Sequence, residues 1–189
     1  MLPNISIRKA KREEAQIIAP FLLLAMEDIV YEFTGEKSSE KAKHFLTSLI
    51  DEPKNQYSYE NCWVAELAHK IVGVALIYDG GQLNELRAPV LQKIASSYHR
   101  KLKPEDETAE GEYYIDCVGV DTSLQGQGIG SRILRFLIDE YVTKAGRTLG
   151  LLVDKENPNA EKLYLKLGFE IVGEKTLVGK KLNHLQYKI

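Results

Sequence analysis

The chain has 189 residues, of which 44% are hydrophobic and 28% are charged, as is typical of a globular protein built around one core. A net charge of -2 and a pI near 6.1 disfavour a dedicated nucleic-acid binder, because such proteins usually carry a basic face. No apolar run approaches the roughly 18 residues that a membrane helix needs, and the start of the chain lacks the pattern of a signal peptide. We therefore expect a cytoplasmic protein that contacts neither nucleic acid nor membrane.

The two cysteines, Cys62 and Cys117, both lie inside apolar runs. This placement indicates reduced core residues in a reducing compartment rather than a disulfide or a metal pair. His44, His69 and His184 are scattered along the chain, so we expect no metal site.

The N-terminal part predicts a short strand followed by two helices. Residues 5–8 form the strand candidate, and residues 15–33 carry apolar side chains three and four positions apart, which predicts a helix. Pro20 falls inside this helix and is expected to kink or divide it. A second helix, capped by Ser38 or Ser39, follows with its own apolar stripe.

The middle of the chain predicts a hairpin and then a long connection. Strands at residues 62–67 and 71–78 are separated by a three-residue turn, so they should pair antiparallel. The segment from about residue 82 to 111 is too long for a simple loop and is expected to hold an inserted helix, within 82–103, followed by an acidic loop. The acidic run within 105–112 then either attracts a cationic amine or is only a solvated loop.

The last part alternates strands with helices and ends in two strands. The expected elements, in chain order, are a buried strand at 113–120, a helix from 129 to 141 that stops before Gly146, a strand at 149–153, a short helix from Asn157 to Gly168, and an antiparallel pair at 169–177 and 182–189. The whole order predicts a single α/β (mixed α+β) domain over residues 1–189, with helices on both faces of a mixed sheet.

Three glycines, Gly126, Gly128 and Gly130, alternate directly after the buried strand and at the start of a helix. The first turn of a helix offers unpaired N–H groups, and glycine lets a ligand approach the backbone closely, so this pattern favours an anion cradle. The alternative is a glycine-rich turn that only packs the helix against the sheet. Ser131 stands where a dinucleotide fingerprint needs glycine, and no lysine completes a P-loop.

The spacing that fits is Q-x-x-G-x-G, formed by Gln125, Gly128 and Gly130. Farther along, the stretch from Asn157 to Phe169 has the form N-x-x-A-x-x-L-Y-x-x-x-G-F. These two motifs, in this order, resemble those of the GNAT acetyltransferase superfamily, and the resemblance covers roughly residues 113–169.

The resemblance implies a twisted, mostly antiparallel sheet that is splayed where coenzyme A binds. It implies an acyltransferase that moves an acetyl group from acetyl-CoA to the amine of a small-molecule or peptide acceptor by direct attack, with no metal. The alternative is a non-catalytic acyl-CoA sensor on the same fold. A homodimer through the C-terminal strands is also possible. The implied cofactor-binding residues are Val118, Gly119, Val120, Gln125, Gly126, Gln127, Gly128, Ile129, Gly130, Ser131, Asn157 and Tyr164.

In the family the strand before the glycine loop carries a bulge, which leaves backbone groups free for a ligand. By resemblance the Val118 N–H would face the thioester oxygen, and Gly119 is consistent with a break in the strand. Tyr164 resembles the general acid that protonates the departing sulfur, although its apolar neighbours also fit a core tyrosine.

The general base is less closely specified than the acid. Asp116, acting through water, and Tyr114 occupy strand positions that point to one face. Asp116 is the first candidate for the base, and Glu112 at the edge of the strand is the second. Asp116 also fits a polar residue that binds a neighbouring backbone group.

Overall fold

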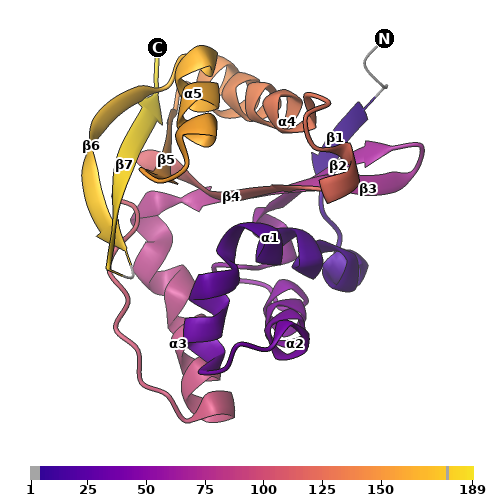
Figure 1. Ribbon diagram of the computed structural model, residues 1–189, viewed down its shortest axis with the longest axis vertical. Helices are drawn as coiled ribbons and strands as arrows, with labels where there is room; N and C mark the ends of the chain where they lie inside the picture. Colours follow the sequence, from indigo (N-terminus) through magenta and orange to yellow (C-terminus); the bar gives the residue numbers. More distant parts are fainter. Residues whose placement is uncertain (1–4, 178) are drawn as a thin grey trace.

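The computed structural model describes residues 5–177 and 179–189. Its seven-stranded sheet has the order β1-β2-β3-β4-β5-β7-β6, and five α-helices lie on its two faces (Figure 1). The strands are β1 (Ile5–Lys9), β2 (Cys62–Leu67), β3 (Lys70–Asp79), β4 (Glu112–Val120), β5 (Thr148–Asp154), β6 (Glu170–Leu177) and β7 (Lys180–Tyr187). The helices are α1 (Ala15–Thr34), α2 (Ser39–Ile50), α3 (Leu83–Tyr98), α4 (Ile129–Leu137) and α5 (Pro158–Leu167).

All neighbouring strands pair antiparallel except β4 and β5, which run parallel. The order of elements, the mixed sheet and the C-terminal hairpin confirm the fold predicted from the sequence. The expectation that the first four residues begin no signal segment lies outside the described residues. Across the described ranges, no helix is both long enough and apolar enough to span a membrane.

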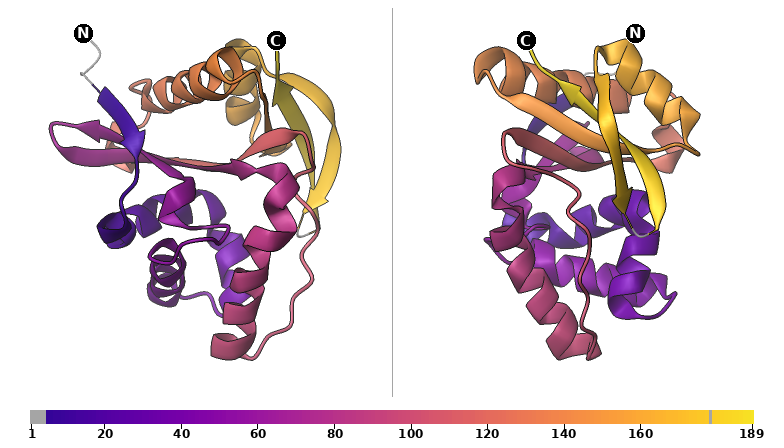
Figure 2. Two further views of the ribbon diagram at one scale, coloured as in Figure 1. Left: turned by 180° about the vertical axis from the view of Figure 1, so that it is seen from behind. Right: turned by 90° about the vertical axis from the view of Figure 1, so that its left-hand side faces the viewer.

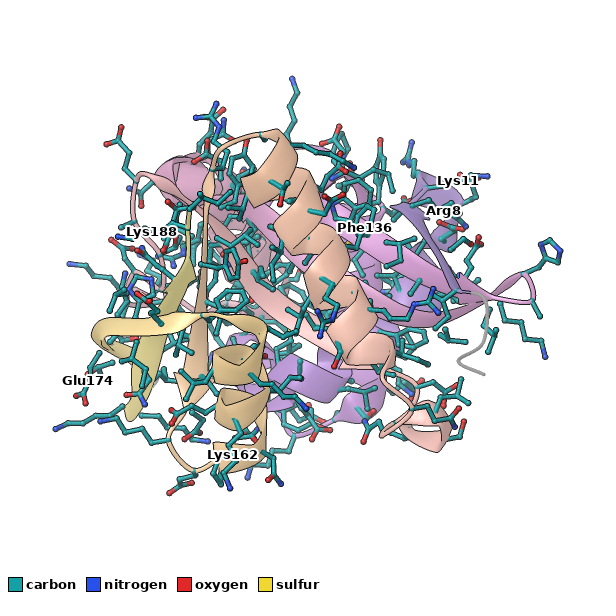
Figure 3. The ribbon with its side chains drawn as sticks, turned by 90° about the horizontal axis from the view of Figure 1, so that it is seen from above. Arg8, Lys11, Phe136, Lys162, Glu174 and Lys188 are labelled. Carbon is teal, nitrogen blue, oxygen red and sulfur yellow. The ribbon has the colours of Figure 1, made fainter. Side chains whose placement is uncertain are left out.

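The two faces of the sheet are covered by different sets of helices. In Figures 1 and 2, α1, α2 and α3 lie on one side, while α4 and α5 lie on the other. Figure 3 looks onto the second side, where α4 carries Phe136 and α5 carries Lys162. Each side encloses its own apolar cluster, with Cys62 and Cys117 buried in the first as free cysteines, as expected. The functional strand β4 lies between the two clusters.

The strands β4 and β5 separate part-way along their length. They pair only from Glu112 opposite Thr148 to Ile115 opposite Leu151. Beyond Ile115, β4 remains paired with β3 alone, and beyond Leu151, β5 remains paired with β7 alone. The sheet is therefore open between these two strands, and this opening positions the site.

Two helices differ in detail from the sequence-based expectation: the first breaks as expected but at another residue, and the second reaches its expected end in another helical form. Helix α1 continues through Pro20, and its backbone leaves helical geometry at Met26 instead (φ -133°, ψ 26°). The residues around Met26 line the opening of the sheet, so the irregularity lies at the site rather than at the proline. The helix after the glycine loop also changes character, because its last part, Ile138–Lys144, is a π-helix.

The acidic segment after α3 is not merely a solvated loop. Glu107 and Glu112 are 8% and 3% exposed, and both are hydrogen-bonded inside the protein. In Figures 1 and 2 this segment rises past the β6–β7 hairpin, where the Lys175 side chain donates to the Asp106 carbonyl at 3.4 Å. Burial of a carboxylate requires partners, and those partners belong to the site described next.

Candidate active site

A cavity of about 670 Å³ occupies the opening between β4 and β5 and extends toward α1 and α3. Such a volume is in the range of small-molecule sites. Eight residues that the sequence singled out line it: Tyr114, Asp116, Val118, Gly119, Val120, Gln125, Asn157 and Tyr164. The structure thus brings together the strand, the start of the glycine loop and α5.

A β-bulge in β4 marks the point where the opening begins. Ile77 of β3 pairs with Ile115 and Leu76 pairs with Cys117, so Asp116 is the additional residue without a partner in β3. A bulge redirects a side chain and interrupts regular pairing. Here it turns Asp116 toward the cavity at the position where β4 leaves β5.

Gly119 does not cause the break, which corrects the sequence-based interpretation. It pairs in register with Val74, and a β-carbon at this position would come within 2.2 Å of the Phe21 carbonyl oxygen. Glycine is required because the backbone of α1 lies directly against β4. The same contact forms one wall of the cavity, to which Gly119 itself contributes.

The glycine loop has the geometry of an anion cradle. Gly126 and Gly128 adopt left-handed backbone conformations, with φ of 79° and 80°. The first helical bond of α4 joins the Arg132 amide to the Gly128 carbonyl at 3.0 Å, so the preceding amides have no intrahelical acceptor. Those amides belong to Ile129, Gly130 and Ser131. The partial positive charge at this helix start adds to their attraction for an anion.

Two loop residues contribute less than the sequence suggested. The Ile129 side chain is buried in the second apolar cluster, so only its backbone is available to a ligand. The Gln127 amide already donates to the Leu124 carbonyl at 3.4 Å. Gln125, in contrast, lines the cavity and also reaches the Val120 carbonyl at 3.4 Å.

On the opposite side of the opening, α5 presents Asn157 and Tyr164. Asn157 caps the helix by accepting from the Ala160 amide at 3.2 Å, and it also lines the cavity. The Tyr164 hydroxyl makes no hydrogen bond within the described residues. Burial raises the pKa of this phenol, so Tyr164 carries its proton at neutral pH. A protonated hydroxyl without a partner in an open cavity is suited to donate to a ligand.

Asp116 belongs to a buried polar network. Its Oδ2 atom accepts from Gln56 Nε2 at 3.1 Å and from the Tyr78 hydroxyl at 3.0 Å. The same two donors reach Glu107 Oε1, at 2.6 Å and 3.2 Å respectively. Glu107 in turn pairs with Arg87, a residue that is only 6% exposed. Two carboxylates therefore share two neutral donors beside the cavity.

The surroundings make Asp116 an unusually weak acid. Loss of solvation, and then the negative charge of Glu107, raise the pKa of Asp116 to about 7, although the hydrogen bonds from Gln56 and Tyr78 oppose this. A carboxyl group with a pKa near neutrality can accept a proton and release it at physiological pH. Its neighbour Tyr114 is buried, and burial raises the pKa of its phenol, so Tyr114 carries its proton at neutral pH.

Sequence reasoning missed Gln56, Tyr78 and Arg87, and it considered Glu107 only as part of the acidic run. One signal was available for Arg87: it lies on the same helical stripe as Leu83, at a position where burial requires a carboxylate partner. Gln56 and Tyr78 come from separate segments and carry no local pattern that indicates a site.

The second candidate for the base, Glu112, lies outside the cavity wall and is fully occupied. It accepts from Thr108 at 2.9 Å and from Gln186 at 2.8 Å, and it lies 2.8 Å from His184. These contacts anchor the start of β4 to β7 and to the acidic segment. Glu112 thus has a structural role in these contacts, and the cavity does not bring it together with Asp116.

Comparison with known proteins agrees with this geometry. The model of the acetyltransferase (GNAT) family matches residues 25–169, which include both motifs, the bulge and most of the cavity wall. The chain belongs to the GNAT acetyltransferase family. The splayed strands and the loop at the start of α4 are thus this family's features as they occur in this chain.

Individual relatives agree with the family assignment. A 62-residue stretch, 33% of this chain, is 42% identical to the N-alpha-acetyltransferase RimI of Mycobacterium tuberculosis, and the match spans 37% of that relative's length. The crystal structure of an acetyltransferase has a TM-score of 0.79 and 32% identity, over 97% of this chain and 99% of the other. An N-acetyltransferase from Staphylococcus aureus Mu50 has a TM-score of 0.82, with 22% identity over 96% and 100% of the two chains.

Proposed function

We propose that this protein is an acetyl-CoA-dependent N-acetyltransferase that acts on a primary amine. The observation that carries the proposal is the shared cavity, in which Asp116 and Tyr164 face one opening beside the glycine loop. Direct transfer needs a group that removes a proton from the amine and a group that protonates the departing thiolate. The two side chains have the complementary proton states for these tasks at neutral pH.

The residues of the chain suit the cofactor. The amides at the start of α4 and the two left-handed glycines would hold the pyrophosphate of coenzyme A. The backbone of Val118 and Val120, which lies beyond the end of the β4–β5 pairing, would hold the pantetheine arm. The Val118 N–H would then stabilise negative charge on the thioester oxygen, as a backbone donor does in an oxyanion hole.

In the proposed reaction, Asp116 removes a proton from the acceptor ammonium through a water molecule. The free amine nitrogen attacks the acetyl carbonyl carbon, and the carbon–sulfur bond breaks. Tyr164 gives its phenolic proton to the leaving sulfur, and the attacking nitrogen loses its second proton to water, so that the products are a neutral acetamide and the free thiol. Exchange with water returns the proton to Tyr164 and removes it from Asp116.

The test is calorimetry with acetyl-CoA, followed by measurement of thiol release over a panel of amines. The panel contains small-molecule amines and peptides with free α-amines, the latter because the related RimI is an N-alpha-acetyltransferase. We expect micromolar binding of acetyl-CoA and acceptor-dependent thiol release. Absence of both results would refute the proposal, whereas binding without transfer to any acceptor would favour the sensor on the same fold.

A further inference from the structure

The segment between β3 and β4 places a second carboxylate beside the candidate base. Glu107 is 8% exposed and lines the cavity. It accepts hydrogen bonds from the same Gln56 amide and Tyr78 hydroxyl as Asp116. Residues 107 and 116 therefore interact through only one intervening side chain.

Glu107 is held in place on both sides along the chain. Arg87 of α3 pairs with Glu107 through Nη2 and with Asp106 through Nη1, the latter at 2.8 Å. On the other side, the Thr108 hydroxyl donates to Glu112 at 2.9 Å. Glu107 is thus fixed by an ion pair and by a neighbouring anchor. Its link to Asp116 runs through the donors that both carboxylates share.

The shared donors can satisfy both carboxylates in their charged forms. Gln56 supplies two amide protons and Tyr78 supplies one hydroxyl proton, while the acceptors are one oxygen of Asp116 and one of Glu107. The other oxygen of Asp116, Oδ1, accepts no hydrogen bond from the residues that the structure describes. Since Asp116 lines the cavity, this oxygen is the one available to a water molecule or an acceptor.

We propose that Glu107 is a positioning residue, which holds a negative charge beside Asp116 and so makes Asp116 basic enough to take a proton from the acceptor ammonium. This inference rests on the proposed function, in which Asp116 is the base. An ordinary aspartate is too weak a base for this task at neutral pH, and a fixed like charge is one of the few ways to strengthen it. The segment between β3 and β4, which contains α3 and Glu107, thereby contributes to the proposed proton transfer.

The other ionisable groups around Asp116 do not provide this effect. Most of them are neutral at pH 7, because burial raises the pKa of each phenol and thiol among them, and Arg87 acts in the opposite direction from Glu107. These groups are Tyr57, Tyr78, Tyr114, Cys62, Cys117 and Arg87. Glu107 is therefore the charge whose removal should change Asp116 most.

The experiment is a ¹³C NMR titration of the full chain labelled at aspartate carboxyl carbons, without any ligand. Asp116→Asn identifies the signal of interest. In Glu107→Gln we expect Asp116 to bind its proton about tenfold more weakly, or weaker still, than in the unmodified protein. Glu110→Gln, which removes an exposed carboxylate from the same segment, should leave the Asp116 titration unchanged. An unchanged titration in Glu107→Gln would overturn the inference.

Glu107→Gln leaves Arg87 paired only with Asp106, and this loss could prevent folding. A second variant, Tyr78→Phe, tests the network in that case. Tyr78→Phe keeps the ring and removes one proton donor to Asp116, so the Asp116 carboxyl should bind its proton more tightly, the opposite direction from Glu107→Gln. No change or a weaker proton affinity in Tyr78→Phe would contradict the shared network.

The NMR titration tests the coupling of Glu107 to Asp116 separately from the proposed acetyltransferase activity. If Asp116 responds to Glu107 as expected but the protein transfers no acetyl group, the proposed function fails and the coupling stands. If the protein is active, the acidic limb of the kcat/KM profile should move to lower pH in Glu107→Gln. Activity without such movement would overturn the role of Glu107 while leaving the acetyltransferase intact.

Discussion

The two walls of the cavity are built in different ways. The wall that we propose binds the cofactor, here the cofactor wall, is formed by residues of 118–125 and 157–164, continues into the glycine loop outside the cavity, and offers mainly backbone groups and the start of a helix. The wall that we propose faces the acceptor, here the acceptor wall, consists of side chains from α3, β3, β4 and the loops before β2 and β4, joined by hydrogen bonds among Gln56, Tyr78, Glu107 and their neighbours.

This difference determines how each wall responds to change. Backbone amides have no pKa near neutrality and keep their direction when a side chain is replaced, so cofactor binding should be insensitive to pH and to most substitutions. The acceptor wall depends on buried charges that affect one another, and a change at one of them reaches the rest. Variants on the two walls should therefore have separable effects.

The largest separable effect is expected at Tyr164, which lies on the cofactor wall but acts in the chemistry. Tyr164→Phe removes the proton donor and keeps the ring that packs against Phe169. We expect kcat to fall about 100-fold, with the Kd for acetyl-CoA unchanged within a factor of three. Tyr187→Phe is the matched control, because Tyr187 also packs against Phe169 and is not among the residues that line the cavity. A rate loss equal in both variants would refute the role of Tyr164.

Glu112→Gln should lower the stability of the protein by removing contacts that hold the acidic segment and β7 to β4, and it should leave acetyl-CoA affinity unchanged. Although burial disfavours its charge, hydrogen bonds from His184 and Gln186 lower the pKa of Glu112. Its contribution to stability is therefore present above the unfolded-state pKa and is lost as pH falls through the folded-state value. We expect Glu112→Gln to reduce the free energy of unfolding by about 1–3 kcal/mol at pH 7, and by less near pH 3.5, in urea denaturation. A change in acetyl-CoA affinity would contradict the separation of the walls.

Asp116→Asn should show the opposite dependence of stability on pH. The folded protein raises the pKa of Asp116 to about 7, so between roughly pH 4 and 7 the folded state binds more protons than the unfolded state. Stability from this residue is complete at low pH and is lost as pH rises. Asparagine resembles the protonated form, so the variant should be more stable than the unmodified protein by about 1–3 kcal/mol at pH 8. Thermal unfolding at pH 8 and pH 4 would check this, and a gap that widens at pH 4 would contradict it.

The smallest expected effect concerns the backbone of the glycine loop. Gly126→Ala places a β-carbon at φ 79°, where no described atom lies within 4 Å, so the cost is conformational strain of about 1 kcal/mol. We expect calorimetry to show up to about a fivefold weaker Kd for acetyl-CoA and an unchanged acidic limb of the pH profile. Gly173→Ala, at a glycine with ordinary φ and open surroundings, is the control. A shift of the pH profile in Gly126→Ala would mean that the walls are coupled.

The same contrast explains what could be predicted from the sequence. The glycine loop and the Asn157–Tyr164 helix are local, and contacts such as the Ala160 amide to Asn157 span only three positions. The elements that carry these residues could be predicted from short-range patterns, and the resemblance to the GNAT superfamily implied their place beside the opening of the sheet. The network at Asp116 joins residues 51 and 60 positions apart, and no local period encodes such contacts.

The positions of the two backbone irregularities, the bulge in β4 and the break in α1, also could not be predicted from short-range sequence patterns. The bulge falls at Asp116 rather than at Gly119 because it depends on the pairing of β4 with β3, which places an additional residue between Ile115 and Cys117. The break in α1 likewise lies at Met26, which lines the cavity, and not at the proline of the helix.

One cavity thus combines the cofactor wall with a separate wall on which we propose that Asp116 accepts the proton. The most direct measurement compares the unmodified protein with Asp116→Asn, by acetyl-CoA calorimetry and by acceptor-dependent thiol release on the same preparations. We expect Kd values that agree within a factor of three and a rate that falls at least about 100-fold in the variant. Equal rates in the two proteins, or a loss of acetyl-CoA binding that accounts for the loss of rate, would contradict the claim.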